Sequence, residues 1–350
     1  MAKPVTDDTS ISAKTDADKR ASARAAFAAQ YLPDGAELIA LPADASFRSY
    51  YRVRGADMPM LLMDAPPGPE DLPAYLRIDS YLLDNGLAAP KVMASDIENG
   101  FALIEDFGDR TYTRLLASGA DETALYTLAI DVLAALHHCP IPTGDSGIAD
   151  YNLDRLLAEA ALFPDWYWEH VTGTPPSADQ HERFMAIMAE IMGDVAGRRE
   201  CLVLRDYHVD NLMLRPDQPE GDIASCGLLD FQDGLIGARA YDLMSLFEDA
   251  RRDVPPELAE AMRARYLTQC PPDDPVRFEQ DYRALAIGRH AKILGIFVRL
   301  NKRDGKPKYL QHLPRIAGQI GRHLEHPSMT DLKAFLDTEC PGWRMPKPAA

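Results

Sequence analysis

The chain has 350 residues, of which 46% are hydrophobic and 26% charged, a composition typical of a globular protein with two lobes or domains. Its formal net charge of −17 argues against DNA, RNA or anionic membranes as general partners, because these are negatively charged too. The five cysteines are widely spaced and form no CxxC pair, which predicts reduced thiols rather than a cysteine zinc site or a disulfide framework.

The N-terminus is polar and of mixed charge, without the apolar core of a signal peptide. The longest strongly apolar runs, such as Ile293 to Val298, are far shorter than the ~20 residues that span a bilayer. We therefore expect a cytoplasmic protein that acts as a monomer.

The first part of the chain is expected to hold a disordered tail over residues 1–18 and a small β-rich lobe over residues 19–107. The elements expected in this lobe are a helix over 19–31, strands over 46–53 and 60–63, a helix over 70–85 and a strand over 101–105. Turn residues support these limits, because Pro-Asp-Gly at 33–35 and Asn-Gly at 85–86 are typical of helix ends.

The remainder, residues 108–350, is expected to form a larger and mainly helical lobe. Leu125, Tyr126, Ala129, Val132 and Leu133 recur at helical spacing. Further helices are expected over 151–170, 178–195, 256–267, 277–300 and 308–324, and short strands over 201–204, 212–214 and 227–231. The predicted fold class is therefore α+β, with two lobes.

One segment of this lobe points to chemistry. A strand delivers Arg205-Asp206 into a loop, Asn211 follows five residues after Asp206, and a second strand begins. Further on, another strand ends in Asp230. Protein-kinase catalytic segments place an aspartate, an asparagine and a second aspartate in this order.

Phosphoryl transfer explains the choice of residues. One carboxylate, Asp206, would orient the acceptor hydroxyl or take its proton, while Asn211 and Asp230 would hold Mg²⁺ against the phosphates of ATP. Two hairpin turns capped by Asp and Asn are the alternative for each residue taken singly. The ordered set favours the kinase interpretation.

The segment Arg205-Asp206-Tyr-His208-Val-Asp-Asn211 resembles the aminoglycoside phosphotransferase and choline kinase branch of the protein-kinase-like fold. That resemblance implies a bilobal fold. It also matches His208 to the extra histidine of the branch, which either braces the loop or contacts substrate. Asp242, in a downstream run that also matches the branch, would cap a helix and brace the loop.

Other motifs resemble one subfamily, the anomeric kinases of N-acetylmuramate and N-acetylglucosamine in peptidoglycan recycling. These motifs are Asp44-Ala-Ser-Phe-Arg-Ser-Tyr-Tyr-Arg-Val, Met63-Asp-Ala-Pro-Pro, Ile104-Glu-Asp-Phe-Gly-Asp, Leu229-Asp-Phe-Gln-Asp and Gly295-Ile-Phe-Val-Arg-Leu with Arg303-Asp-Gly-Lys. The resemblance runs from about residue 20 to 325 and implies a small-molecule amino sugar as substrate.

The nucleotide would be held without a Walker motif or a GxGxxG loop, since the chain has neither. The turn Ala45-Ser46-Phe47-Arg48-Ser49 would instead fold over the phosphates, although a plain hairpin explains it equally well. By resemblance, the strand that ends at Glu105, with Phe107 after it, is the hinge whose backbone pairs with adenine.

The strand that carries the phosphate-binding lysine in protein kinases reads Met60-Leu-Leu-Met-Asp64 here, without a lysine. The positive charge would come from an arginine, either Arg48, Arg52 or Arg54, or the phosphates would rely on magnesium and backbone. Glu70 and Asp71 are candidates for the glutamate that usually pairs with this cation.

Candidate substrate contacts lie in the helical lobe. The aromatic pair Trp166 and Tyr167 could stack on a sugar ring or fill the core. Arg289 lies on an apolar helix stripe and needs a partner, which could be a substrate carboxylate or an acidic residue of the chain. Arg299 invites the same two interpretations.

The leading prediction is an ATP-dependent sugar 1-kinase that acts on N-acetylmuramate and N-acetylglucosamine. An aminoglycoside or amino-alcohol kinase is the first alternative. A nucleotide-binding pseudokinase scaffold is the second, because the strand lysine is missing.

Overall fold

The computed structural model describes residues 8–42, 46–215, 217–219 and 221–345, with side chains from residue 18 onward. Two compact units divide the chain. The first comprises Met1–Leu83 with Ala89–Asp109, and the second comprises Asp84–Ala88 with Arg110–Ala350. Residues 1–7 of the predicted tail, and Ala45 of the predicted phosphate turn, lie outside the described residues.

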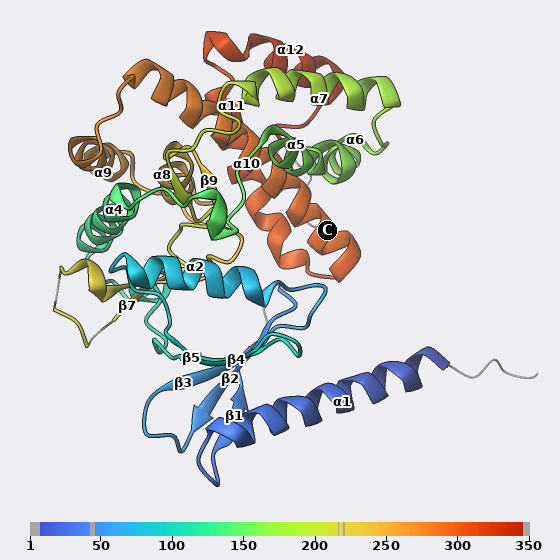
Figure 1. Ribbon diagram of the computed structural model, residues 1–350. Helices are drawn as coiled ribbons and strands as arrows, with labels where there is room; N and C mark the ends of the chain where they lie inside the picture. The colour runs from blue at the N-terminus through green and yellow to red at the C-terminus, as the bar shows by residue number, and fades with distance from the viewer. Residues whose placement is uncertain (1–7, 43–45, 216, 220, 346–350) are drawn as a thin grey trace, which may run out of the picture. The chain divides into compact units, whose positions relative to one another are not determined.

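A five-stranded antiparallel sheet forms the first unit, in the order β1-β2-β3-β5-β4 (Figure 1). Its elements are α1 (Asp8–Tyr31), β1 (Glu37–Ala40), β2 (Ser49–Arg54), β3 (Met60–Asp64), α2 (Leu72–Asp84), β4 (Val92–Asp96) and β5 (Phe101–Glu105). Helix α1 begins at Asp8, eleven residues before the predicted start at Lys19. β1 and β4 are strands that the sequence analysis did not predict, and each lies at an edge of the sheet.

Helix α1 packs on this sheet through one aromatic contact and a buried charge pair. The ring of Phe27 stacks on Phe101 of β5, with centroids 5.7 Å apart. Arg20 and Arg24 both bond to the buried carboxylate of Asp64 on β3, at 2.6 and 3.0 Å. The pair of arginines compensates a carboxylate that burial would otherwise destabilise.

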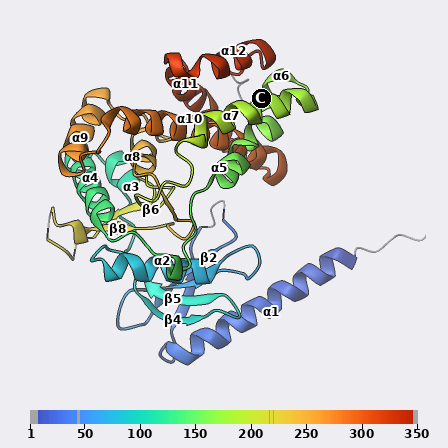
Figure 2. The same cartoon turned by 45° about the horizontal axis from the view of Figure 1, so that its top comes forward.

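The second unit is mainly helical (Figure 2). Its helices are α3 (Tyr112–Ala117), α4 (Glu122–His138), α5 (Leu153–Ala160), α6 (Trp168–Thr172), α7 (Ala178–Gly193), α8 (Ala240–Phe247), α9 (Pro256–Gln269), α10 (Pro275–Asp304), α11 (Leu313–His323) and α12 (Thr330–Glu339). Four short strands pair in twos: β6 (Cys201–Val203) with β9 (Leu235–Gly237), and β7 (Leu212–Leu214) with β8 (Cys226–Leu228).

The 30-residue helix α10 is the centre of this unit, and it contacts α5, α7, α8 and α11. Asp274 caps its first turn by accepting a hydrogen bond from the Arg277 N–H, and Pro275 follows at a position where proline is tolerated. Gly305 ends the helix with φ +64°, in the left-handed region that glycine enters most easily.

The predicted helix over 151–170 is interrupted. α5 ends at Ala160, a π-helical turn covers Phe163–Tyr167, and α6 follows. Pro164 lies in that turn and cannot donate a backbone hydrogen bond, so a regular α-helical ladder is broken there.

Candidate active site

The order of strands and loops brings two polar loops together within the second unit. One loop links β6 to β7 and carries Asp206, and the other links β8 to β9 and carries Asp230. The Leu229 N–H donates to the Asn211 carbonyl at 3.0 Å, which joins the end of the first loop to the residue before Asp230. The antiparallel β7–β8 pair therefore places Asn211 beside Asp230.

The side-chain amide of Asn211 also ties the loop to itself. Its Nδ2 donates to the backbone carbonyl of Asp206 at 2.9 Å, so its Oδ1 is the atom available to a metal ion. Asp230 adds carboxylate oxygens, which are hard ligands of the kind that Mg²⁺ prefers. The donor set at this point fits the ion that the kinase interpretation requires.

Two residues of the loops have left-handed backbone conformations without being glycine. Arg205 has φ +72° and Asp230 has φ +57°. Such residues cost free energy and persist where the surrounding contacts hold them, often at functional sites. Arg205 immediately precedes Asp206, and Asp230 itself carries the other carboxylate of the site.

A buried carboxylate beneath the first loop holds one of these conformations. Asp242 accepts hydrogen bonds from the backbone N–H groups of Leu204 and Arg205, at 2.6 and 2.9 Å. Burial raises the pKa of Asp242 to about 7, although these two bonds oppose the shift. The predicted loop brace is present, but the predicted helix cap is wrong: α8 begins after Arg239, and Asp242 lies within its first turn.

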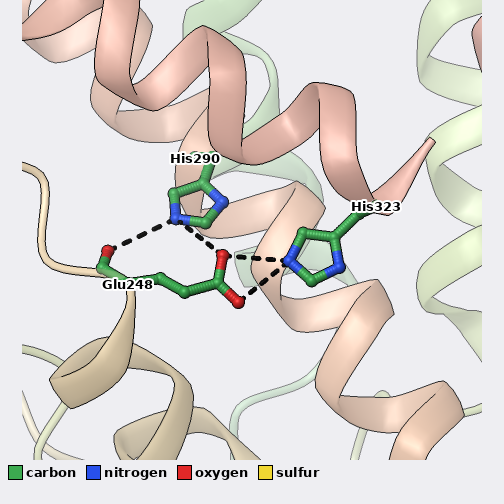
Figure 3. Close-up of side chains that lie close together, drawn as sticks. All are labelled: Glu248, His290 and His323. Atoms are coloured by element: carbon green, nitrogen blue, oxygen red, sulfur yellow. Dashed lines mark hydrogen bonds and ion pairs between the residues drawn. The ribbon is translucent and has the colours of Figure 1, made fainter. Parts of the chain in front are cut away.

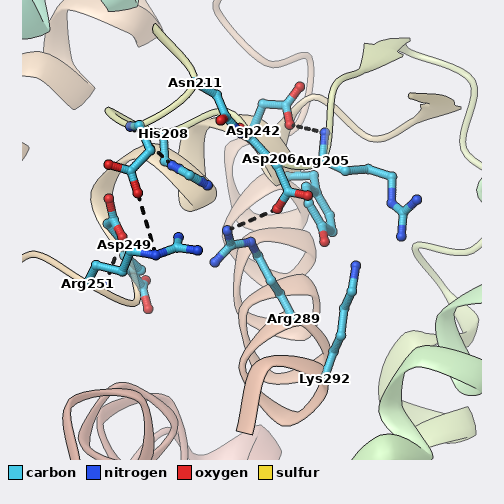
Figure 4. Close-up of polar contacts among 12 residues, drawn as sticks. Arg205, Asp206, His208, Asn211, Asp242, Asp249, Arg251, Arg289 and Lys292 are labelled. Atoms are coloured by element: carbon cyan, nitrogen blue, oxygen red, sulfur yellow. Dashed lines mark hydrogen bonds and ion pairs between the residues drawn. The ribbon is translucent and has the colours of Figure 1, made fainter. Parts of the chain in front are cut away.

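Positive charges surround Asp206 (Figure 4). Arg289 of α10 reaches the Asp206 Oδ1 with its Nη2 at 3.7 Å, and Lys292 lies one turn further along the same helix. Desolvation alone would raise the pKa of Asp206, but Lys292 and Arg289, followed by His208 and Arg205, outweigh it and lower that pKa to about 2. The carboxylate is 43% exposed and ionised at neutral pH, as a group that accepts a hydrogen bond from an acceptor hydroxyl must be.

A second carboxylate, Glu159 of α5, neutralises part of this charge. It pairs with the guanidinium of Arg205 and, at 3.3 Å, with the Lys292 ammonium. The Tyr151 hydroxyl donates to the same carboxylate at 2.6 Å. Arg205, Arg289 and Lys292 therefore share the carboxylates of Asp206 and Glu159, while the carboxylates of Asp230 and Asp242 lie on or beneath the same loops.

His208 is buried, and its ring Nδ1 accepts a long hydrogen bond of 3.4 Å from the Asp210 N–H. Asp210 in turn pairs with Arg251 at 3.5 Å and accepts a hydrogen bond from the Thr113 hydroxyl. These contacts favour the bracing role for His208 among its two predicted roles.

The remaining candidate substrate contacts differ in exposure. Tyr167 is fully buried and donates its hydroxyl to the Trp343 carbonyl at 2.5 Å, so no face of its ring can receive a sugar. That residue is a core residue, and the prediction that it stacks on substrate was wrong. Trp166 is half-buried, and the Nε of Arg299 is buried without a hydrogen-bond partner among the described residues.

Glu70 organises the candidate phosphate turn in the first unit. Its carboxylate accepts hydrogen bonds from the Ser46 hydroxyl at 2.9 Å and the Phe47 N–H at 3.0 Å, and it pairs with Arg48 at 3.2 Å. Ser49 begins β2, opposite Asp64 of β3. The turn thus has a cation–carboxylate pair, and Glu70 is its acidic member.

The other two candidate arginines are engaged elsewhere. Arg52 pairs with Asp106 at 2.6 Å and with Asp109 at 2.9 Å, and the hydrogen bonds that it donates to Asp109 and then to Asp106 raise its pKa. Arg54 is largely exposed and lies 3.6 Å from Glu37. Arg48 therefore remains the strongest candidate among the three for the missing lysine.

The candidate hinge is short. Glu105 ends β5 and donates its backbone N–H to the Lys91 carbonyl at 2.9 Å, while Phe107 is buried.

Two residues of the charge arrangement, Lys292 and Glu159, and one buried acid of the first unit, Asp79, were not singled out from the sequence. Lys292 lies three residues after Arg289, so the helical spacing could have indicated it. Glu159 carried no signal, because its partners come from a distant loop and helix. Asp79 is a buried acid on α2 whose Oδ1 has no hydrogen-bond partner within the described part of the chain.

Solved structures with the same architecture are small-molecule kinases. They include a microcompartment-associated aminopropanol kinase (TM-score 0.59, 16% identity, 89% of this chain and 98% of that chain) and a choline kinase from Streptococcus pneumoniae (0.58, 12%, 88% and 98%). An ADP-bound aminoglycoside phosphotransferase is similar too (0.56, 15%, 86% and 96%). These similarities show a protein-kinase-like fold, which confirms the predicted fold class.

The sequence comparisons are more specific. The profile of the phosphotransferase enzyme family (APH) matches residues 37–286. N-acetylmuramate/N-acetylglucosamine kinases are similar over most of their length: that of Pseudomonas aeruginosa is 36% identical over 86% of this chain and 89% of its own, and that of Caulobacter vibrioides is 33% identical over 93% and 98%. The chain belongs to the phosphotransferase enzyme family, and it is an enzyme that transfers phosphate to an alcohol group.

Within the described residues, no helix is both long and apolar enough to cross a membrane.

Proposed function

We propose that the protein phosphorylates the anomeric hydroxyl of N-acetylmuramate and N-acetylglucosamine with ATP, as a step in peptidoglycan recycling. The names and coverage of the similar kinases support this substrate class. The observation that carries the chemistry is the juxtaposition of Asp206, Asn211 and the Asp230 loop by hydrogen bonds within one unit. We further propose that the enzyme acts as a monomer in the cytoplasm.

In this proposal, Asp206 accepts a hydrogen bond from the anomeric hydroxyl and takes its proton as the oxygen attacks the γ-phosphorus of ATP. One P–O bond forms to the sugar, and the bond between the γ-phosphorus and the β,γ-bridging oxygen breaks to release ADP. Asn211 Oδ1 and the Asp230 carboxylate would hold Mg²⁺, which supplies charge neutralisation at the phosphates.

Arg289 is proposed to contact the substrate, and it is also a neighbour of Asp206. Its side chain is 4% exposed, and its Nη1 has no hydrogen-bond partner among the described residues. A buried guanidinium nitrogen without a partner is unfavourable, and an anionic or carbonyl oxygen of the substrate would satisfy it. His208 and Trp166 remain weaker candidates, and Arg299 is a further one.

On the nucleotide side, Ser46, Phe47, Arg48 and Ser49 are proposed to contact the phosphates, and the backbone at Glu105 and Phe107 to contact adenine. Arg48 would supply the positive charge that a strand lysine supplies in protein kinases. The pair that it forms with Glu70 supports this assignment, since a carboxylate beside the cation fixes its position.

The charge around Asp206 separates the proposal from its alternatives. Cations beside the acceptor hydroxyl would repel a polycationic aminoglycoside, and Arg289 and Lys292 both lie close to Asp206. A neutral or anionic sugar suits this environment better. A pseudokinase scaffold has no need for the aspartate–asparagine–aspartate set, which is complete in this chain.

A substrate panel tests the proposal. ADP release is measured with ATP, Mg²⁺ and one of N-acetylmuramate, N-acetylglucosamine, kanamycin or choline. We expect turnover of the two amino sugars at rates well above those for the other two compounds. Turnover of kanamycin or choline alone would replace the proposed substrate, and no turnover with any acceptor would favour the scaffold.

A further inference from the structure

Three potential metal ligands meet in the second unit outside the residues assigned to phosphoryl transfer (Figure 3). Glu248 directly follows α8, His290 lies in the middle of α10, and His323 is the last residue of α11. One ligand atom from each lies within 4.8 Å of the others. Both imidazoles direct Nε2 toward the same carboxylate, as Figure 3 shows.

His290 is the member whose contacts are incomplete. Its side chain is fully buried, its Nδ1 has no hydrogen-bond partner among the described residues, and its Nε2 has only long contacts: 3.5 Å to the Glu248 carbonyl and 3.6 Å to the Glu248 Oε2. A buried polar ring with neither nitrogen well bonded is costly. A ligand bound at Nε2 would remove that cost for one nitrogen.

We propose that Glu248, His290 and His323 bind one divalent metal ion of the zinc class, which links α8, α10 and α11. Two imidazoles and a carboxylate are a donor set that suits zinc, with a water molecule as the fourth ligand. Bonds of about 2.0–2.1 Å in tetrahedral geometry place ligand atoms roughly 3.3 Å apart.

The contacts from Glu248 Oε2, 2.9 Å to the His323 Nε2 and 3.6 Å to the His290 Nε2, lie on either side of that value, and the three ligand atoms all lie within 4.8 Å of one another.

The surroundings support metal binding in three further ways. Burial lowers the pKa of His290 to about 4, so its ring is neutral at pH 7 and has a lone pair to donate. Tyr282 hydrogen-bonds to the Glu248 carboxylate and would orient it, as second-layer groups commonly orient metal ligands. His323 is 15% exposed, which leaves a path for the ion from solvent.

Such an ion would be structural, and it would also act close to the catalytic loop. His290 directly follows Arg289, the residue that reaches Asp206. Holding His290 against Glu248 and His323 would fix this turn of α10 against two other helices. The ion would be separate from Mg²⁺, since imidazole ligands favour zinc and Mg²⁺ favours oxygen.

The test uses the whole chain, without nucleotide, after removal of metals with a chelator and in the presence of excess Mg²⁺. Zinc is added, and bound metal is counted by mass spectrometry after gel filtration. We compare wild type with His323→Gln and with His326→Gln, a matched change of an exposed histidine three residues further on.

Wild type and His326→Gln are expected to retain one zinc ion per chain and His323→Gln none. At a zinc concentration about 100 times the Kd, the melting temperature of wild type should rise by roughly 4 °C.

Absence of zinc from wild type, or equal retention by His323→Gln, would overturn the proposal and leave a hydrogen-bonded Glu–His network. If His323→Gln does not fold, Co²⁺ replaces zinc in the wild-type protein. Visible absorption typical of tetrahedral Co²⁺ with histidine ligands supports the site, and its absence overturns it. These measurements do not use sugar phosphorylation. Their outcome therefore tests the metal site independently of the proposed function.

Discussion

At the scale of single residues, the site depends on carboxylates whose surroundings differ. Asp206 is ionised because the charge of nearby cations outweighs its desolvation. Burial instead raises the pKa of Asp242, whose carboxylate accepts hydrogen bonds from the loop backbone. Asp206, Asn211 and Asp230 could be predicted from the sequence because they lie in two short motifs with fixed spacing. Glu159 and Lys292 could not, because only the folded chain brings their helices to the loop.

Asp230→Asn should weaken the use of Mg²⁺ more than the binding of sugar. Replacing a carboxylate ligand with an amide removes a negative charge, so the Mg²⁺ concentration that gives half-maximal activity should rise roughly 10- to 100-fold. Asp154→Asn, an exposed aspartate of α5, is the matched control and should leave this concentration unchanged. An unchanged Mg²⁺ dependence in Asp230→Asn would argue against its role as a ligand.

Asp79 predicts a pH dependence of stability. Burial, and then the charge of Glu105, raises its pKa to about 7 in the folded protein, above the ordinary value of 3.8. A raised pKa means that Asp79 contributes stability below about pH 4 and that this contribution is lost as the pH rises through 7.

In thermal melts, the melting temperature of Asp79→Asn should therefore rise relative to that of wild type between pH 5 and pH 8, because asparagine stays neutral. Asp84→Asn, an exposed aspartate at the end of the same helix, should show no such trend. A difference for Asp79→Asn that is constant with pH would contradict the raised pKa.

At the scale of elements, hydrophobic periodicity predicted the position of helices that have one apolar face. It did not predict where tertiary packing interrupts a helix. α9 and α10 lie where the spacing predicted them. The interruption at the π-helical turn Phe163–Tyr167 depends on Pro164 and on a close approach of α10 that spacing alone does not show. The edge strands β1 and β4 were missed because both are short and partly exposed, which gives weak hydrophobic patterns.

Gly295 marks this close approach. A Cβ added there would lie 2.1 Å from the Leu162 carbonyl oxygen, a backbone atom that cannot move aside easily. Gly295→Ala should therefore destabilise the protein by about 2 kcal/mol or more, despite the better helix propensity of alanine.

Gly318 of α11 is the control, because nothing lies within 4 Å of its added Cβ. Gly318→Ala should raise the free energy of unfolding by about 0.5–1 kcal/mol. Chemical denaturation of both variants checks the pair, and equal effects at the two glycines would show that Leu162 does not restrict α10.

At the scale of the whole molecule, net charge and local charge point to different partners. A charge of −17 excludes few small substrates, but the cations around Asp206 favour a neutral or anionic acceptor. Composition alone could not separate sugar kinases from aminoglycoside kinases. The positions of Arg289 and Lys292 beside Asp206 favour a sugar acceptor, and only the fold shows these positions.

Locating the transferred phosphate tests the central claim most directly. N-acetylmuramate is incubated with ATP, Mg²⁺ and either wild type or Asp206→Asn, and ³¹P and ¹H NMR identify the phosphorylated carbon. We predict a sugar 1-phosphate from wild type and a rate at least about 100-fold lower from Asp206→Asn. Phosphate on another hydroxyl, or an equal rate from the folded variant, would contradict the assignment of Asp206 to the anomeric hydroxyl.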